Sequence, residues 1–399
     1  MILTLNAGSS SIKFALYRMS GAELALDAGG QVEGIGTRPH FIARSADGAL
    51  LCEGFREPTP RRGHARAFEQ IWSWLSEHAG SSAILAVGHR VVQGGPEHTQ
   101  PVLIDGALMK TLAGLVPLMP LHLPNNIALI QAVTDQLPDL PQVACFDTAF
   151  HQGRAPVTER FALPHALFER GVRRYGFHGL SYEFIVQRLR ALSPDAAAGR
   201  VVVAHLGSGC SMTAIRDGRC VDTSMSFSAL DGLPMGTRCG ALDPGVLLYL
   251  MREDGMGAAE LEDLLYKRSG LLGMSGVSND LRALHASDDP RAAEAIEYFV
   301  YRVGQFLGSL AASLGGIDTL VFTAGVGEND AELRARICAD AAWLGLDLDA
   351  SANSAQQGGV RRITRDDSAV TGWVIPTDEE LMIARHTRDV VSMESVPGD

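Results

Sequence analysis

Basic residues are scarce in this 399-residue chain: 34 Lys and Arg stand against 46 Asp and Glu, which gives a formal net charge of −12. This balance excludes a broad basic surface of the kind that binds nucleic acid. An acidic protein can still bind phosphate groups if a few arginines gather in a cleft. The 46% hydrophobic and 20% charged residues, with a mean hydropathy of +0.07, are typical of a globular protein.

Long apolar runs and paired cysteines are also lacking. No stretch approaches the roughly 20 apolar residues of a membrane-spanning helix, so we expect no membrane partner. The apolar start, Met1–Leu5, meets Asn6 and Gly8 too early for the hydrophobic region of a secretion signal. The six cysteines form no Cys-x-x-Cys pair and no ligand-like spacing with histidine. Free thiols in a reducing cytoplasm are therefore expected rather than disulfides or a metal framework.

Two similar segments are present, one in each half of the chain. Each runs from an apolar strand through a glycine–hydroxyl turn into a second strand, at Thr4–Phe14 and at Val203–Thr213. Gly8 and Gly207 occupy equivalent places about half the chain apart. A glycine lets the backbone approach a bound oxyanion, to which neighbouring N–H and hydroxyl groups donate. The pattern predicts a duplicated fold that holds a polyphosphate from both sides.

The length favours two domains rather than one. Apolar periodicity predicts amphipathic helices over 66–78 and 291–314, the second ended by Gly315. Strands are expected within 1–17 (as a hairpin), 30–51, 84–87, 143–146 and 319–323. A tight turn over 325–329 and a helix over 330–344 should follow that last strand. Strand, glycine turn and helix N-terminus together form an arrangement that can receive a phosphate.

Four polar segments beside strand-like runs are candidates for chemistry: 88–95, 144–151, 175–179 and 236–240. Each has a structural alternative. Asp147 can be a strand-end cap, Arg238 a solvated loop residue, and His178 a structural histidine. Their number, together with the twin hairpins, favours a functional site. Arginine offers planar, permanently charged, bidentate donors to carboxylate and phosphate, so the set predicts phosphoryl transfer.

Together these segments resemble the acetate kinase family, in the superfamily of acetate and sugar kinases, heat-shock protein 70 and actin. The resemblance rests on eight collinear segments across nearly the whole chain: 6–13, 89–95, 147–151, 176–179, 235–238, 243–245, 323–329 and 376–381. It implies an α/β fold of two ribonuclease H-like domains, a duplicated actin-like ATPase fold with an active-site cleft between them. The acyl-kinase domain would comprise 1–147 plus 378–399, with a returning helix over 378–391. The nucleotide-binding domain would comprise 148–377.

The resemblance also implies roles for individual residues. Asp147 would be catalytic, and His178 and Arg238 would stabilise the transition state. Arg90 would hold the acyl carboxylate, in a pocket with Val92, Leu121 and Phe177. Asn6 and Glu379 would organise Mg²⁺, or alternatively Mn²⁺, and Lys13 would lie near the nucleotide phosphates. Contacts to ATP or ADP would come from His205, Leu206, Gly207, Ser208, Gly209, Asp280, Leu281, Arg282, Gly325, Val326, Gly327, Glu328 and Asn329.

The implied reaction transfers the γ-phosphate of ATP to acetate and gives acetyl phosphate and ADP, in a cytoplasmic homodimer. Two alternatives stay open: a kinase that prefers propionate, and an actin-like nucleotide-binding switch with no acyl substrate. The presence of Arg90, His178 and Arg238 argues against the switch, because an ATP clamp does not need them. A phosphoryl-transfer transition state spreads its charge over three equatorial oxygens, so positioning and cationic donors dominate catalysis.

Asp147 is expected to orient Arg90 or a metal-bound water rather than to act as a base. The substrate carboxylate is already ionised at neutral pH and needs no base. Three positions depart from the family pattern: Ser208 replaces Asn, Gln93 replaces His and Ala229 replaces Pro. Loss of that proline should enlarge the acyl pocket slightly. One methylene is worth only about 1–3 kcal/mol of discrimination, so propionate stays open as the preferred substrate.

Overall fold

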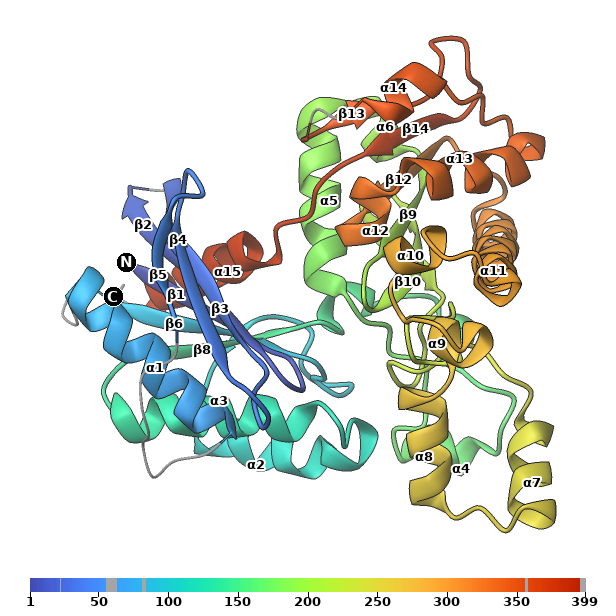
Figure 1. Ribbon diagram of the computed structural model, residues 1–399. Helices are drawn as coiled ribbons and strands as arrows, with labels where there is room; N and C mark the ends of the chain where they lie inside the picture. Colours follow the sequence, from blue (N-terminus) through green and yellow to red (C-terminus); the bar gives the residue numbers. More distant parts are fainter. Residues whose placement is uncertain (22, 55–62, 81–83, 356–357, 395–399) are drawn as a thin grey trace. The chain divides into compact units, whose positions relative to one another are not determined.

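Figure 1 shows the computed structural model, which describes residues 1–21, 23–54, 63–80, 84–355 and 358–394. The chain divides into two compact units. Unit 1 comprises Met1–Ala149 with Asp378–Asp399, and unit 2 comprises Phe150–Thr377. Each unit is mixed α/β and contains one sheet, which confirms the predicted fold class. Within the described ranges, no helix combines the length and the apolar character that crossing a membrane requires.

The sheet of unit 1 follows the order β5-β4-β3-β2-β1-β6-β8-β7. Its strands are β1 (Ile2–Ala7), β2 (Ile12–Ser20), β3 (Glu23–Glu33), β4 (His40–Ser45), β5 (Leu50–Glu53), β6 (Ala86–Val91), β7 (Val102–Leu103) and β8 (Gln142–Phe146). Strand β1 pairs antiparallel with β2 and parallel with β6, and β6 pairs parallel with β8. The predicted N-terminal hairpin is confirmed. The strand expected over 84–87 begins later, at Ala86, and continues to Val91.

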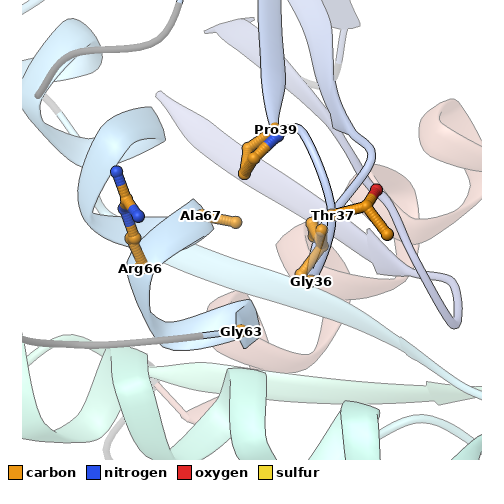
Figure 2. Close-up of a pocket in the computed structure, with 7 residues that line it drawn as sticks. Gly36, Thr37, Pro39, Gly63, Arg66 and Ala67 are labelled. Carbon is orange, nitrogen blue, oxygen red and sulfur yellow. The ribbon is translucent and has the colours of Figure 1, made fainter. Parts of the chain in front are cut away.

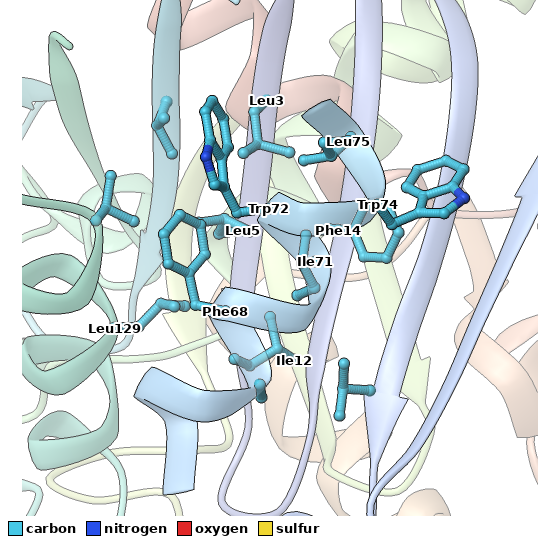
Figure 3. Close-up of a cluster of buried hydrophobic side chains, with 14 of the residues drawn as sticks. Leu3, Leu5, Ile12, Phe14, Phe68, Ile71, Trp72, Trp74, Leu75 and Leu129 are labelled. Atoms are coloured by element: carbon cyan, nitrogen blue, oxygen red, sulfur yellow. The ribbon is translucent and has the colours of Figure 1, made fainter. Parts of the chain in front are cut away.

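One face of this sheet is covered by α1 (Gly63–His78) and α3 (Leu123–Gln136), with α2 (Gly106–Leu115) packed on α3. Figure 3 shows Phe68, Ile71 and Leu75 of α1 directed at strand side chains such as Leu3 and Leu5. Burying side chains of this size stabilises the fold by about 1.5–3 kcal/mol each. The predicted helix over 66–78 is confirmed and begins three residues earlier. Both tryptophans of α1, Trp72 and Trp74, are buried.

The opposite face of the unit 1 sheet is covered by the C-terminal helix α15 (Glu379–Glu394), red in Figure 1, which packs on β1, β6 and β8. Gly88 of β6 permits this contact. A Cβ at Gly88 would lie 2.1 Å from Thr387 Oγ1 and 2.6 Å from Ile383 Cγ2. The side chains of Thr387 and Ile383 therefore pack directly on the strand backbone at Gly88, and this close packing positions α15, whose first residue is Glu379.

Unit 2 repeats the pairing pattern of unit 1. Its strands are β9 (Arg200–Leu206), β10 (Cys210–Arg216), β11 (Arg219–Thr223), β12 (Thr319–Thr323), β13 (Arg361–Arg362) and β14 (Thr371–Val374). The run β11-β10-β9-β12-β14 has two antiparallel and then two parallel pairings, as has β3-β2-β1-β6-β8. The duplication inferred from the twin hairpins is thus confirmed at the level of sheet topology.

The two long helices of unit 2 lie on opposite sides of its sheet (Figure 1). Helix α5 (Gly179–Leu192) packs apolar side chains against β9, β10 and β12, and α11 (Pro290–Leu314) packs on β10 and β11. The predicted helix over 291–314 is confirmed, with Asp289 as its N-cap and Gly315 as its left-handed C-cap.

Shorter elements are η2 (Val116–Leu118) in unit 1 and, in unit 2 or at its border, η3 (Ala149–His151), η4 (Pro156–Glu159), α4 (His165–Glu169), α6 (Pro194–Ala198), α7 (Pro244–Glu253), α8 (Ala258–Lys267), α9 (Gly270–Ser275), α10 (Leu281–His285), α12 (Ala324–Asn329), α13 (Ala331–Asp340), η5 (Ala342–Leu344) and α14 (Ala350–Ser354).

The tight turn predicted over 325–329 is wrong, because the short helix α12 directly follows β12. Ala324, the first residue of α12, has a φ of 65°, which is in the left-handed region. The glycines that suggested a turn, Gly325 and Gly327, lie inside that helix. The following helix, expected over 330–344, ends as α13 at Asp340 and is continued by a 3-10 turn.

Replacing Gly88 by Ala should displace α15, because the added Cβ meets Thr387 and Ile383. We expect the free energy of unfolding to fall by about 1–3 kcal/mol, measured by chemical denaturation. Gly114→Ala is the matched control, since a Cβ there meets no atom within 4 Å and Gly114 lies in α2. That variant should be unchanged or slightly more stable. Equal stability of both variants would contradict the close packing of α15 on β6.

Candidate functional site

A row of polar side chains crosses the sheet of unit 1 at the end where β1, β6 and β8 finish. The register pairs Asn6 of β1 with Lys13 of β2 on one side and with Arg90 of β6 on the other. Paired residues on adjacent strands point to the same face, so these three side chains lie in a row. Asp147 follows the last residue of β8, and Glu379 begins the helix on this face. Five predicted site residues are thereby brought together in one unit.

Arg90 and Asp147 form the central contact of this row. Asp147 Oδ1 accepts a hydrogen bond from Arg90 Nε at 3.0 Å, and Oδ2 accepts from the Nη2 of the same guanidinium. Arg90 Nη1 donates to Asn6 Oδ1 at 3.3 Å, and Glu379 Oε2 lies 4.0 Å from Arg90 Nε. Asp147 is fully buried, and its backbone N–H donates to Val91 O. This side-on bidentate geometry fixes the plane of the guanidinium.

The pKa values of Arg90 and Glu379 are shifted, because both side chains are largely buried close to other charged groups. Burial alone would lower the pKa of Arg90, but the charges of Asp147 and Glu379 outweigh it and raise that pKa. Burial raises the pKa of Glu379 to about 7; Arg90 opposes this shift, and the charges of Asp147 and Glu380 add to it. The negative charges are therefore only partly compensated by the arginine.

The donor set fits a hard divalent cation. Glu379 supplies carboxylate oxygens beside the amide oxygen of Asn6, and both are ligand types that Mg²⁺ prefers. Among the residues that the structure describes, no group of three or more His, Cys, Asp or Glu side chains surrounds a common metal position. Mg²⁺ commonly uses one or two carboxylates and takes further ligands from water and substrate phosphates, so a two-residue set is sufficient.

The predicted acyl-pocket residues Val92 and Leu121 both lie in unit 1, whereas Phe177 is buried in unit 2. The buried side chain of Asn126, in α3, accepts a hydrogen bond from Val92 N at 3.1 Å and donates to Ala7 O at 3.4 Å. It links the end of β1 to the segment after β6. Sequence reasoning missed Asn126, because an amide inside an apolar helix belongs to no motif.

Two histidines predicted from the sequence meet in unit 2. The rings of His178 and His205 stack with centroids 4.2 Å apart and an angle of 15°. Each is held at Nδ1 by a serine hydroxyl: Ser211 for His178 at 2.8 Å and Ser181 for His205 at 2.9 Å. The register pairs His205 with Ser211 and with Thr323. Through the duplication, these are the positions that Asn6, Lys13 and Arg90 occupy in unit 1.

The turn that carries His178 is held by a further histidine. His151 Nε2 donates to Phe177 O at 2.8 Å. Burial, with a smaller contribution from the charge of Arg154, lowers the pKa of His151 to about 3, so the ring is neutral. A Cβ at Gly176 would lie 2.5 Å from the His151 ring, which explains the glycine there. His178 follows with a left-handed backbone at φ 59° and ψ 26°, at the start of α5.

The side chain of Arg238 is held by a backbone carbonyl. Its Nη1 donates to Ala229 O at 2.9 Å, and its guanidinium lies 6.0 Å from the Tyr266 ring. Burial raises the pKa of Cys210 to about 12; the hydrogen bond to Gly207 O and, less strongly, the charge of Arg238 oppose that shift.

The residues predicted to contact ATP all lie in unit 2, but their side chains differ in availability. Ser208 is exposed at the tip of its turn, whereas Leu206 and Leu281 are buried in the core. Glu328 Oε1 accepts from Thr377 N at 3.2 Å, and Asn329 Nδ2 donates to Gly325 O. The side chains of Ser208 and Arg282 are exposed, whereas the backbone N–H groups of Asp280 and Arg282 already donate to Ser278 Oγ and Asp280 Oδ1. The remaining members are Asp280 and Arg282, which pair with each other at the start of α10, together with His205, Gly207, Gly209, Val326 and Gly327.

A cavity of about 220 Å³ lies in unit 1 between the loop after β3 and the start of α1 (Figure 2). It is lined by Ile35, Gly36, Thr37, Pro39, Gly63, Arg66 and Ala67. None of the predicted site residues is among these, so this cavity is separate from the Arg90 row.

The decisive comparison is with a known family. A model of the acetokinase family matches residues 1–385 of the chain. The chain belongs to the acetokinase family. Membership confirms the resemblance read from the eight motifs, and it implies ATP, a divalent metal ion and a small-molecule acyl substrate.

Individual members of the acetokinase family align over almost the full chain. An acetate kinase of Rhodopseudomonas palustris is 52% identical over 97% of this chain and 97% of its own length. The crystal structure of Porphyromonas gingivalis acetate kinase superposes with a TM-score of 0.87 at 38% identity, covering 98% of this chain and 99% of that one. A propionate kinase from Francisella tularensis superposes with a TM-score of 0.89 at 36% identity, covering the same shares. These likenesses confirm the fold.

Proposed function

We propose that this protein is an acetate kinase, which transfers the γ-phosphate of ATP reversibly to acetate and forms acetyl phosphate and ADP. One observation carries the proposal: Arg90 is held by Asp147 in a fixed plane beside Asn6, Lys13 and Glu379. A planar guanidinium next to a hard-cation donor set suits a carboxylate that attacks a phosphoryl group. The family's acetate-named relatives support the same substrate.

In unit 1, Arg90 binds the acetate carboxylate, and Asp147 keeps the guanidinium oriented. Val92 and Leu121 contact the methyl group. Lys13 binds nucleotide phosphate. Asn6 and Glu379 would hold Mg²⁺, with Mn²⁺ an acceptable substitute, and the bound ion would neutralise phosphate charge.

In unit 2, His178 and Arg238 donate to the oxygens of the transferring phosphoryl group, on which charge accumulates in the transition state. The turn from His205 to Gly209, the segment from Asp280 to Arg282 and the helix from Gly325 to Asn329 bind ATP. In the second segment the exposed side chain of Arg282 is the accessible group, because Leu281 is buried and the N–H groups of Asp280 and Arg282 already donate hydrogen bonds within the protein.

Trapping the acyl phosphate with hydroxylamine tests this function across acetate, propionate and butyrate, with ATP and Mg²⁺. We expect the highest kcat/KM with acetate, loss of turnover with a chelator, and recovery with Mn²⁺. A higher kcat/KM with propionate would favour the second candidate, to which Ala229 and the propionate kinase likeness point. ATP binding without acyl-dependent ADP release would instead support a nucleotide-binding switch.

We also propose a cytoplasmic homodimer, in keeping with six free cysteines. Helix α7 exposes four apolar side chains: Val246 (40%), Leu248 (50%), Tyr249 (61%) and Met251 (50%). A second copy of the chain that covers this helix would remove them from water. Analytical ultracentrifugation should find a dimer for the wild type and a weaker dimer for Leu248→Glu with Tyr249→Glu. A monomeric wild type rejects this part of the proposal.

A further inference from the structure

We propose that Ser211 and Tyr182 are positioning residues for His178: their linked hydroxyls hold Nδ1 of the imidazole so that Nε2 faces the turn at Gly209. This inference rests on the proposed role of His178 in phosphoryl transfer. Neither Ser211 nor Tyr182 is among the site residues predicted from the sequence. Their placement follows from the strand register and from the first turn of α5.

The anchor acts at one ring nitrogen. Ser211 Oγ lies 2.8 Å from His178 Nδ1 and is also hydrogen-bonded to the hydroxyl of Tyr182. The two ring nitrogens of an imidazole are distinct, and a partner at one of them sets the orientation of the other. Ser211 comes from β10, the strand that begins directly after the Gly207–Gly209 turn. The strand that continues this turn therefore also orients the histidine beside it.

The opposite nitrogen lies against Gly209. A Cβ at Gly209 would be 3.1 Å from His178 Nε2 and 3.4 Å from Cε1. The imidazole edge thus occupies the space next to this glycine, where a side chain would crowd it. Gly209 is one of the residues expected to contact nucleotide phosphates, so Nε2 is placed beside the group on which it is proposed to act.

Tyr182 makes the anchor rigid. It is fully buried one turn into α5, and its ring contacts His151 edge-on at 5.6 Å. His151 in turn holds the carbonyl of Phe177, the residue before His178. Burial raises the pKa of Tyr182 above its ordinary value, so the phenol stays protonated and keeps its hydrogen bond to Ser211. Backbone and ring of His178 are therefore held through the same cluster.

The stacked His205 ring completes the arrangement. Its Nδ1 is bonded to Ser181 Oγ, which also bonds Thr377 Oγ1 at 2.8 Å. The two rings lie nearly parallel, so a rotation of His178 about its side chain would break the stack. Ser211 determines which edge of the His178 ring faces Gly209, and the stack limits tilting.

The test compares Ser211→Thr with Ser211→Val, which have the same shape and differ only in the hydroxyl. The valine variant should lower kcat for acetate phosphorylation by about 10- to 100-fold, with the KM for ATP little changed. The threonine variant should recover most of kcat. Tyr182→Phe should give an intermediate loss, because it keeps the ring and removes only the second hydroxyl.

Thr319→Val is the matched control. It removes another buried hydroxyl of the unit 2 sheet, which pairs with Thr371 at 2.9 Å. We expect it to lower the melting temperature and to leave kcat unchanged. Equal kcat values for Ser211→Thr and Ser211→Val, or an equal loss in Thr319→Val, would overturn the positioning role.

Nitrogen-15 spectra of the histidine rings separate this inference from the proposed function. The His178 signals, assigned by their absence in His178→Gln, should shift in Ser211→Val and Tyr182→Phe and stay in place in Thr319→Val. Unchanged His178 signals in Ser211→Val overturn the inference even if acetate is the substrate. A wild type that does not phosphorylate acetate but shows the shifts contradicts the proposed function and supports the anchor at Nδ1.

Discussion

The interaction on which the site of unit 1 depends is the buried, side-on contact between Arg90 and Asp147. A charge removed from water is costly unless it is paired and hydrogen-bonded. Asp147 meets this requirement with both carboxylate oxygens, and Asn6 takes a third donor of the guanidinium. This pair constrains the neighbouring elements. Strands β6 and β8 must end side by side, and α15 must bring Glu379 close to Arg90. Gly88 allows that approach because it has no side chain.

The duplication explains how one strand arrangement carries two chemically different rows of side chains, one in each unit. The same register positions carry Asn6, Lys13 and Arg90 in unit 1, and His205, Ser211 and Thr323 in unit 2. One sheet geometry thus displays a charged row in the first unit and a row of imidazole and hydroxyl groups in the second. The two glycine–hydroxyl turns from which the duplication was inferred occupy the same place in the two sheets. The side chains on the strands beside them differ. The two units therefore share a strand arrangement but differ in the side chains at equivalent positions.

Hydrophobic periodicity and turn residues predicted those helices and hairpins whose formation depends on neighbouring residues in the sequence. The helices at 66–78 and 291–314 and the two hairpins follow from periodicity and turn residues, and the structure contains them with small shifts at their ends. The collinear motifs predicted the family. The prediction of a turn over 325–329 was wrong, because the glycines that suggested it lie inside helix α12, which starts at Ala324 with a left-handed φ.

Supporting residues could not be found from the sequence, because they act through contacts distant along the chain. Asn126 joins the end of β1 to the segment that follows β6, and Ser211 reaches a histidine 33 positions earlier. Their residue types carry no signal until the fold places them. Motif positions can also mislead about availability: Leu206 and Leu281 lie in core packing, and Glu328 is committed to Thr377.

The most direct test of the Arg90–Asp147 account is the pH profile of kcat in the Asp147→Asn variant. An asparagine keeps one hydrogen bond to the guanidinium and removes the carboxylate. If Asp147 orients Arg90, kcat should fall while every pH-dependent limb of the wild-type profile is retained. Loss of a limb in the variant would identify Asp147 as a proton-transferring group and contradict the account.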